Sequence, residues 1–338
     1  MPWLGVLPLL LISSAVATNS SGCTSYYASS TDPDLAPPKR WCQSGSYFTF
    51  HSRANNRSAQ LFGRCSSGVG TNQTIMLGHG WPTSSYDFAP LASILESHSL
   101  RVCAIDYVGH GFSDKPRAPW RYHITDHAWA VHDFIVARQI KQFAYLTHDE
   151  GASVGLALLQ QYQQTQQPLY TISHHFILDG SIYLPKASIQ ESQKALLSNL
   201  TGPALERLIS AQMLAKGLGS KVFSPQLSSS EVSALASVLD YQSGTHILHD
   251  TIQYLQDRRE HEVEWLEVLH NSSIDCTMIW GTKDPIATLN VSDYVWQNYL
   301  RDRPHANSSY FKIEGANHYL QIDHVEQVAA VVLKMLSR

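Results

Sequence analysis

Residues Thr147-His148-Asp149-Glu150-Gly151-Ala152 give the clearest indication of how this chain folds. They follow the apolar run 143–146 and precede 153–159, a run of small and aliphatic residues that favours a helix. A strand, a tight turn and a helix form a nucleophile elbow, in which one reactive side chain is raised above the edge of a sheet. Small residues flank that side chain because the turn has strained backbone angles. We therefore predict that Asp149 is a nucleophile, because a carboxylate can form an ester with a substrate carbon.

The same region offers an alternative nucleophile. Residues Gly151-Ala152-Ser153-Val154-Gly155 match G-x-S-x-G, the signature of serine esterases and lipases. The strand is expected to end near Thr147, so Ser153 would lie about one turn into the following helix. Placing Ser153 on the turn would require the strand to include 148–150, three polar residues that are unfavourable in a buried strand. We prefer Asp149 and keep a serine esterase or lipase as the alternative.

Two apolar strands are expected upstream of the elbow, at 74–78 and 101–105. The first is followed by His79-Gly80-Trp81-Pro82. In folds that carry a nucleophile elbow, the loop after such a strand donates a backbone amide to the oxyanion hole. We expect the amides of Trp81 and Glu150 to form the hole. The Trp81–Pro82 bond is a candidate cis peptide, since only X–Pro bonds adopt cis at low cost.

The residues expected to assist the nucleophile follow two late strands. Asp284 comes after the apolar run 276–281, and His318 comes after 310–313. The chain order nucleophile, acid, histidine is the order found in α/β-hydrolases. We therefore predict Asp284 and His318 as the acid and the base of a triad. Asp179, at the end of an earlier apolar run, is the alternative acid.

Four longer motifs carry a family resemblance. They are Ser44-Gly45-Ser46-Tyr47-Phe48-Thr49, His79-Gly80-Trp81-Pro82-Thr83-Ser84-Ser85-Tyr86-Asp87, Gly111-Phe112-Ser113-Asp114-Lys115-Pro116 and His148-Asp149. From about Trp41 to the C-terminus, the chain resembles the α/β-hydrolase superfamily, in the branch that contains epoxide hydrolases and haloalkane dehalogenases. The resemblance implies an α/β fold with a mostly parallel eight-stranded sheet, flanking helices and an inserted helical cap.

The resemblance also implies a two-step hydrolysis. Asp149 would form an ester with the substrate, and a water deprotonated by His318 would hydrolyse it, with Asp284 orienting the histidine. The amides of Trp81 and Glu150 would stabilise the oxyanion on Asp149. We expect no cofactor and no metal, and a substrate that is small and apolar or lipid-like. A non-catalytic binding or signalling protein on the same scaffold is a further alternative.

Two positions depart from the family pattern. Glu150 stands where many relatives carry Trp or Tyr, which dehalogenases use to hold the leaving halide; a carboxylate there disfavours dehalogenation. We expect Glu150 to share a pocket with Asp149, with one pKa raised. Epoxide hydrolases of this branch use two cap tyrosines to protonate the opening oxygen. Tyr254 matches one of these tyrosines, and the other has no clear counterpart. The predicted substrate-binding residues are Trp81, Glu150 and Tyr254.

Length and composition indicate one large core with an insertion. The chain has 338 residues, of which 43% are hydrophobic. Residues 183–262 interrupt the alternation of strands and helices and are mostly helical by pattern. We predict a signal peptide at 1–17, an N-terminal extension at 18–43, the hydrolase core at 44–182 and 263–338, and a cap at 183–262. A net charge of -4 and a pI near 6.5 give no reason to expect nucleic acid as a partner.

Several features indicate a protein of the secretory pathway. The apolar run Leu4 to Ile12 leads to Ala15-Val16-Ala17, an A-x-A cleavage pattern. The run is shorter than the ~20 residues of a transmembrane span, no later segment is long enough, and an uncleaved anchor is the alternative. The number of Asn-x-Ser/Thr sequons is far higher than the one or two, roughly, that are expected by chance. They predict glycosylation at Asn19, Asn56, Asn72, Asn199, Asn271, Asn290 and Asn307.

The chain has 5 cysteines. Cys23, Cys42 and Cys65 precede the core and can supply one disulfide, for which we prefer Cys23–Cys42. Cys103 and Cys276 fall on expected central strands and are interpreted as small buried hydrophobic side chains. An odd number leaves at least one thiol unpaired.

Overall fold

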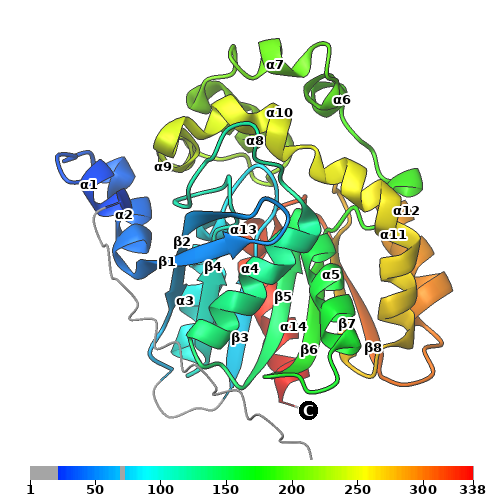
Figure 1. Ribbon diagram of the computed structural model, residues 1–338. Coiled ribbons are helices and arrows are strands. Elements are labelled where there is room, and N and C mark those ends of the chain that lie inside the picture. Colours follow the sequence, from blue (N-terminus) through cyan, green and yellow to red (C-terminus); the bar gives the residue numbers. More distant parts are fainter. Residues whose placement is uncertain (1–21, 69–72, 338) are drawn as a thin grey trace, which may run out of the picture.

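An eight-stranded sheet forms the centre of the protein (Figure 1). The computed structural model describes residues 22–68 and 73–337. The strand order is β1-β2-β4-β3-β5-β6-β7-β8. The β1–β2 and β2–β4 pairs are antiparallel and the others are parallel, which confirms the predicted fold class. The strands are β1 Gly45–Ser52, β2 Arg57–Cys65, β3 Thr74–Gly78, β4 Arg101–Ile105, β5 Gln142–His148, β6 Thr171–Leu178, β7 Asp275–Gly281 and β8 Ser308–Ile313.

The central strands form because their apolar runs can be buried on both sides. Every residue of β3 is buried, and so are the last four of β4. Met76 belongs to the hydrophobic cluster on one face of the sheet, whereas Ile75 and Leu77 belong to the cluster on the other. Continuous apolar runs are typical of parallel strands covered on both faces. The predicted bounds of these two strands are confirmed.

Helices cover both faces of this sheet. On one face α4, α5 and α11 pack on the strands, and on the other α3 and α14 do so (Figure 1). These helices are α3 Ala89–Ser97, α4 Ile124–Ala137, α5 Glu150–Gln164, α11 Tyr254–Asn271 and α14 Val325–Leu336. Shorter helices are α1 Gly22–Tyr26 and α2 Ala36–Gln43 before the sheet, and α12 Leu289–Val295 and α13 Leu320–Asp323 near its end.

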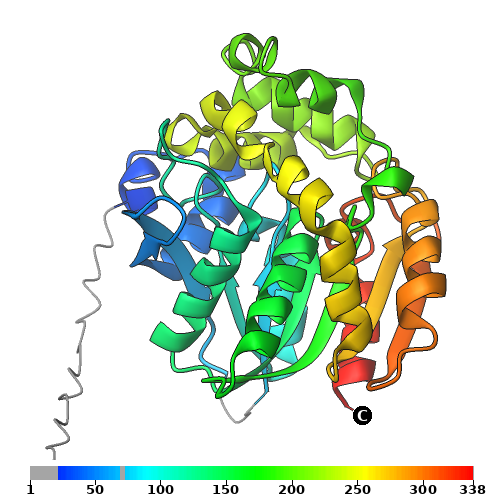
Figure 2. The same ribbon diagram turned by 45° about the vertical axis from the view of Figure 1, so that its right-hand side comes forward.

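The connection between β6 and β7 forms a group of helices over one end of the sheet (Figures 1 and 2). They are α6 Glu191–Leu197, α7 Gly202–Leu205, α8 Ala211–Lys221, α9 Ser229–Asp240 and α10 Leu248–Thr251. Helix α11 begins in this group and then runs down beside the sheet to Asn271, without a break at 262, the predicted end of the cap. Helix α11 therefore connects the helical group directly to the layer of helices beside the sheet.

Two disulfides link residues of the first third of the chain. Cys23–Cys42 is present, as predicted. Cys65–Cys103 is also present, so the interpretation of Cys103 as a buried hydrophobic residue is wrong. The antiparallel β2–β4 pairing, which the sequence did not indicate, places these two residues directly opposite each other. Cys276 is a buried free thiol, as expected.

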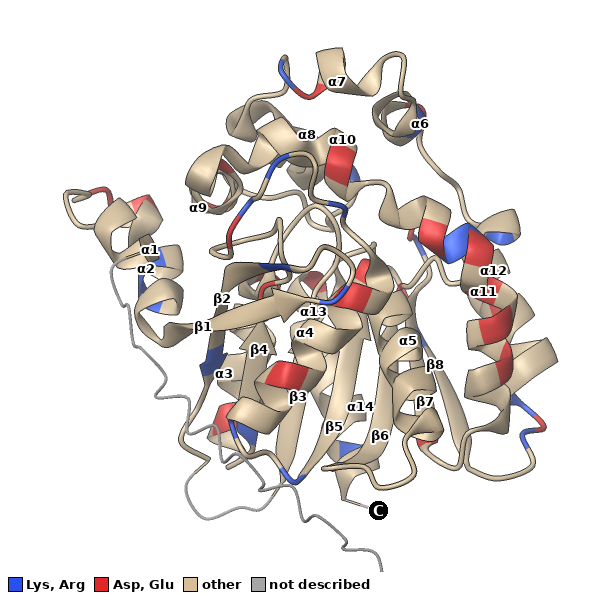
Figure 3. Cartoon of the chain, in the orientation of Figure 1, with Lys and Arg blue, Asp and Glu red and all other residues tan. Residues whose placement is uncertain are grey.

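Basic and acidic residues are interspersed over the chain, and acidic residues repeat along α11 (Figure 3). Within residues 22–68 and 73–337, no helix combines the length and the apolarity needed to cross a bilayer. The predicted signal peptide and Asn19 and Asn72 lie outside the described residues.

Candidate active site

Asp149 occupies a strained turn between β5 and α5. Its backbone has φ 49° and ψ −111°, in a region that side chains other than glycine rarely adopt. Such strain costs about 1–3 kcal/mol and clusters at functional sites. A Cβ atom on Gly151 would lie 2.4 Å from the carbonyl oxygen of Gly78, and one on Gly80 would lie 2.7 Å from Cβ of Asp149. The small residues of the two motifs therefore allow the β3 loop to approach the turn closely.

The loop after β3 donates to the carboxylate of this turn. The backbone N–H of Trp81 donates to Oδ2 of Asp149 over 3.1 Å, and the Trp81–Pro82 bond is cis, as predicted. The amide of Glu150 is at the first position of α5, where helix amides have no partner within the helix. The indole N–H of Trp81 donates to Oγ1 of Thr251 over 3.0 Å, which ties the same loop to α10.

His318 is paired with Asp284 beside this turn. Nδ1 of His318 lies 2.8 Å from Oδ2 of Asp284, and both residues are buried. Nε2 of His148 donates to the carbonyl of His318 over 2.8 Å and fixes its backbone. Burial lowers the pKa of His318, but Asp284, Asp149 and Asp87 together raise it above the ordinary value. The pKa of His318 therefore depends on the charge of all three aspartates.

The alternative acid, Asp179, is directed elsewhere. Its Oδ1 accepts a hydrogen bond of 2.8 Å from the backbone N–H of Gly281, and its Oδ2 has no partner. Burial and the nearby Asp284 raise its pKa. Of the two candidate acids, the one that contacts His318 is Asp284.

Ser153 lies inside α5, one turn beyond Asp149, as expected. The residue is completely buried, and its Oγ accepts a hydrogen bond of 2.7 Å from Nε of Arg258. This hydroxyl is therefore not raised at the turn.

Glu150 takes a different position from the one expected. Its carboxylate is completely buried against two histidines, with Oε1 3.2 Å from Nδ1 of His127 on α4 and Oε2 3.5 Å from Nε2 of His110. Burial raises the pKa of Glu150, with Asp149 a smaller cause, and burial lowers the pKa of His110. Both groups are therefore shifted toward their uncharged forms. The predicted rise in pKa is confirmed, although its main cause is burial and not a shared pocket.

Tyr254 lies above the turn, at the start of α11. Its ring is buried, with its centroid 6.4 Å from that of Trp81, and the guanidinium carbon of Arg258 is 4.9 Å from the ring centroid. Burial raises the pKa of Tyr254; Asp149 raises it further, while Arg258 opposes the rise. The predicted residues Trp81, Asp149 and Tyr254 are thus brought together.

A family model of the alpha/beta hydrolase fold matches residues 73–325, three quarters of the chain. The chain belongs to the alpha/beta hydrolase family. It is 33% identical to the putative hydrolase LipZ of Mycobacterium tuberculosis over 273 residues, which cover 80% of this chain and 90% of LipZ. It is 31% identical to the mesoderm-specific transcript protein of Mus musculus over 261 residues, which cover 75% and 76%.

Solved structures share the fold of this alpha/beta hydrolase. An epoxide hydrolase from Vigna radiata superposes with a TM-score of 0.65 at 16% identity, covering 87% of this chain and 98% of that one. An esterase from Exiguobacterium antarcticum gives a TM-score of 0.65 at 17% identity, covering 86% and 99%. These chemically different neighbours establish the fold alone, because function depends on the site that the fold carries.

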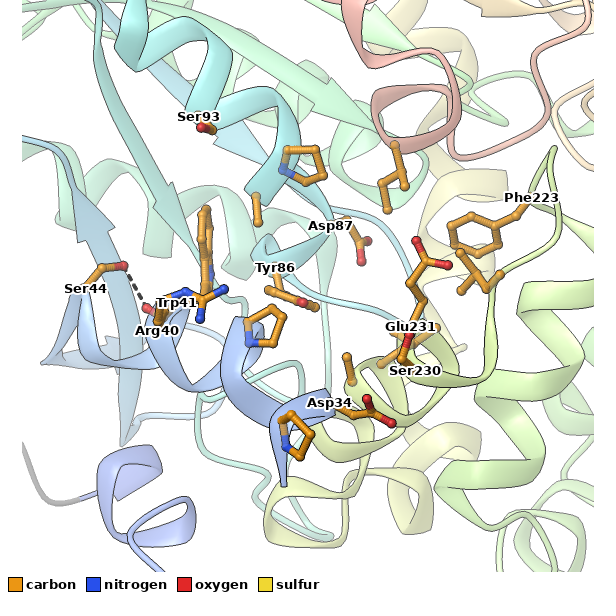
Figure 4. A pocket seen from close by; sticks show the side chains of 18 of the residues that line it. Asp34, Arg40, Trp41, Ser44, Tyr86, Asp87, Ser93, Phe223, Ser230 and Glu231 are labelled. Atoms are coloured by element: carbon orange, nitrogen blue, oxygen red, sulfur yellow. Dashed lines mark hydrogen bonds between the residues drawn. The ribbon is translucent and has the colours of Figure 1, made fainter. Parts of the chain in front are cut away.

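This hydrolase has a cavity of about 710 Å³ whose lining does not include Asp149 (Figure 4). Side chains from α2, α3 and α9 line it, together with Asp87 and Phe223. Oδ2 of Asp87 accepts a hydrogen bond from Oγ1 of Thr83, and burial raises the pKa of the Asp87 carboxyl to about 8. Phe223 stacks on Tyr319, the neighbour of His318, with ring centroids 4.4 Å apart. One layer of side chains therefore separates the cavity from the histidine.

Sequence reasoning missed several buried polar groups of the hydrolase. They lie on helices packed beside the turn or in loops after other strands: Asp87, His110, His127 and Arg258. None belongs to the motifs that predicted the nucleophile, acid and base, and no spacing in the sequence relates them to Asp149. The places of His127 and Arg258 follow from the packing of α4 and α11 on α5, which the sequence did not predict. Asp87 ends one of the family motifs, but that motif gave no indication of its burial.

Proposed function

We propose that this hydrolase acts through an ester on Asp149 and that its substrates are small apolar or lipid-like epoxides. The observation that carries the proposal is the geometry of Asp149. Its strained turn presents one carboxylate oxygen to the Trp81 amide, while the buried Tyr254 lies above it. A proton donor beside a nucleophilic carboxylate is the combination that epoxide opening needs.

In the first step a carboxylate oxygen of Asp149 attacks an epoxide carbon. The carbon–oxygen bond of the ring breaks, and the opening oxygen takes the phenolic proton of Tyr254. In the second step His318 removes a proton from water, and the resulting hydroxide attacks the ester carbonyl of Asp149. The Trp81 amide stabilises the oxyanion, and the ester oxygen departs with the diol, taking the proton of the added hydroxyl so that Asp149 is left as a carboxylate. The proton held by His318 returns through solvent to the Tyr254 phenolate, which restores both groups.

The serine esterase alternative has less support. A catalytic serine must be exposed at the turn beside its base. Ser153 is buried within α5 and already accepts a hydrogen bond from Arg258.

We also propose that the protein matures in the secretory pathway, with a cleaved signal peptide at 1–17, and that residues 183–262 act as its cap. Two disulfides are compatible with an oxidising compartment. The described sequon asparagines are all exposed, as glycan attachment requires: Asn56, Asn199, Asn271, Asn290 and Asn307. Digestion with a glycosidase that removes N-linked glycans should lower the mass of the secreted protein; an unchanged mass would contradict glycosylation.

The mechanism can be tested by separating its two steps. His318→Gln is expected to allow ester formation but stop hydrolysis, because the glutamine cannot act as a base. Intact-protein mass spectrometry after incubation with a panel of epoxides should show an added mass equal to that of one epoxide. The matched control is His318→Gln combined with Asp149→Asn, which should remain unmodified. If His318→Gln stays unmodified with an epoxide that the wild-type protein hydrolyses, the two-step mechanism is wrong.

A further inference from the structure

Arg258 is a completely buried cation that the mechanism above leaves without a role. It lies on α11, where α11 packs on α5. Its Nε donates to Oγ of Ser153 over 2.7 Å, and Nη2 donates to the backbone carbonyl of Asp149 over 3.2 Å. Its Nη1 has no acceptor. The acceptors that Arg258 does have are a neutral hydroxyl and a neutral carbonyl.

No carboxylate neutralises this guanidinium at contact distance. None of the ion pairs within 22–68 and 73–337 includes Arg258. Burial raises the pKa values of Glu150 and Glu262, and the charge of Arg258 only opposes that rise. Their oxygens are directed to His127 and to the amide of Leu184. A buried charge without a contact partner costs several kcal/mol. Because Arg258 lies beside Asp149, its countercharge can form during the reaction.

The place where that countercharge would appear is Tyr254. This residue lies one helical turn before Arg258 on the same helix, so their side chains share a face. The guanidinium carbon is 4.9 Å from the centre of the Tyr254 ring. If Tyr254 gives its proton to the opening oxygen, the phenolate that remains lies beside an uncompensated cation.

We propose that Arg258 is a positioning residue that stabilises the Tyr254 phenolate formed during epoxide opening. The inference rests on the proposed function. In the balanced step, the Asp149–carbon bond forms, the carbon–oxygen bond of the ring breaks, and the Tyr254 proton moves to that oxygen. Arg258 exchanges no proton. Its charge takes the place of the second cap tyrosine, for which the sequence has no counterpart.

The test compares two electrophiles that need different help. Opening of 1,2-epoxyhexane needs a proton, whereas hexyl methanesulfonate has a leaving group that departs as a stable anion without one. Both would place an ester on Asp149, and the rate of mass gain can be followed in the His318→Gln protein, where the ester persists. Arg258→Met is expected to slow labelling by the epoxide by about 10- to 100-fold and labelling by the methanesulfonate by less than about 3-fold.

Matched variants separate this role from a structural one. Arg259 is the adjacent, exposed arginine of the same helix, so Arg259→Met should label like its parent with both compounds. Arg258→Lys keeps the charge and should retain more of the epoxide rate than Arg258→Met; it also serves if the methionine variant does not fold. With Tyr254→Phe already present, Arg258→Met should cause no further change in the ratio of the two rates.

Equal losses with both electrophiles would make Arg258 a structural anchor of the turn. That result would overturn the inference and leave the proposed function intact. A change in the rate ratio that persists with Tyr254→Phe would also overturn it, because Arg258 would then act independently of Tyr254. If neither electrophile labels Asp149 in the His318→Gln protein, the proposed function fails and the inference fails with it.

Discussion

The carboxyl ends of β5, β6 and β7 each carry or precede an aspartate, and the middle one differs from the outer two. Asp149 accepts the Trp81 amide, and Asp284 contacts His318. Asp179, on the strand between them, accepts the amide of Gly281 and leaves its second oxygen without a partner. The difference teaches that position at a strand end does not make a carboxylate catalytic. The groups that its oxygens meet decide its role.

Electrostatics explains why the middle residue differs. Burial is the main cause of the raised pKa of Asp179, and Asp284 and Asp149 add to it. Three neighbouring carboxylates cannot all be ionised cheaply in a buried site, so one of them keeps its proton. Asp179 accepts one hydrogen bond and leaves its other oxygen buried without a donor, so it is the one expected to remain protonated.

The largest effect is expected at Asp149. Asp149→Asn should lower turnover by at least about 10⁴-fold, because the amide has nearly the same shape but is a poor nucleophile. Steady-state hydrolysis of an epoxide, with circular dichroism to confirm the fold, measures this. Ser153→Ala is the control and should retain most activity. The reverse result would show that Ser153 and not Asp149 is the nucleophile. Of the three aspartates, only Asp284 would then have a catalytic role.

A smaller loss is expected at Asp284. Asp284→Asn should slow hydrolysis of the ester by about 10²- to 10⁴-fold, because His318 loses the group that orients it. Asp284 also raises the pKa of His318. Since the neutral histidine is the base, the rising limb of the pH–rate profile should move to lower pH in the variant. Asp149 and Asp87 remain beside His318 and hold part of the shift. An unchanged limb would show that Asp284 does not act on this histidine.

The smallest effect on catalysis is expected at Asp179. Asp179→Asn should change turnover by less than about 10-fold but should alter the pH dependence of stability. Because the folded state holds the proton that the unfolded state releases, the contribution of Asp179 to the free energy of unfolding falls as pH rises above its unfolded pKa. The free energy of unfolding of the variant minus that of the wild type should therefore be more positive at pH 8 than at pH 4. Urea unfolding at the two pH values tests this, and a difference of the opposite sign would contradict the protonated state.

The sequence predicted the strand ends because each central strand is a complete apolar run that ends in polar or turn residues. Thr74–Gly78 and Arg101–Ile105 have the predicted bounds, and Asp149, Asp284 and His318 follow such runs directly or within a few residues. A parallel sheet brings these ends to one edge, so a prediction of strands is also a prediction of which side chains meet.

The partners of Glu150 and Cys103 could not be predicted in this way. Glu150 contacts His127 because α4 packs beside α5, and Cys103 meets Cys65 because β2 pairs with β4. Neither relation leaves a period or a spacing in the sequence. Arg258 and Arg259 are adjacent residues of the same type. Arg258 is buried because it lies on the face of α11 that packs on α5, whereas Arg259 is exposed.

Helix α11 limits how the protein can open. Its 18 residues form one rod, about 27 Å long at 1.5 Å per residue, that begins above Asp149 and ends just before β7. A bend within it would pull Arg258 away from the Asp149 carbonyl. We therefore expect α6 to α10 to rotate as a unit about a hinge just before Tyr254. The Trp81–Thr251 hydrogen bond should break first in this motion. Hydrogen exchange should then be faster in 184–253 than in 254–271, and equal rates would show that the two parts open together.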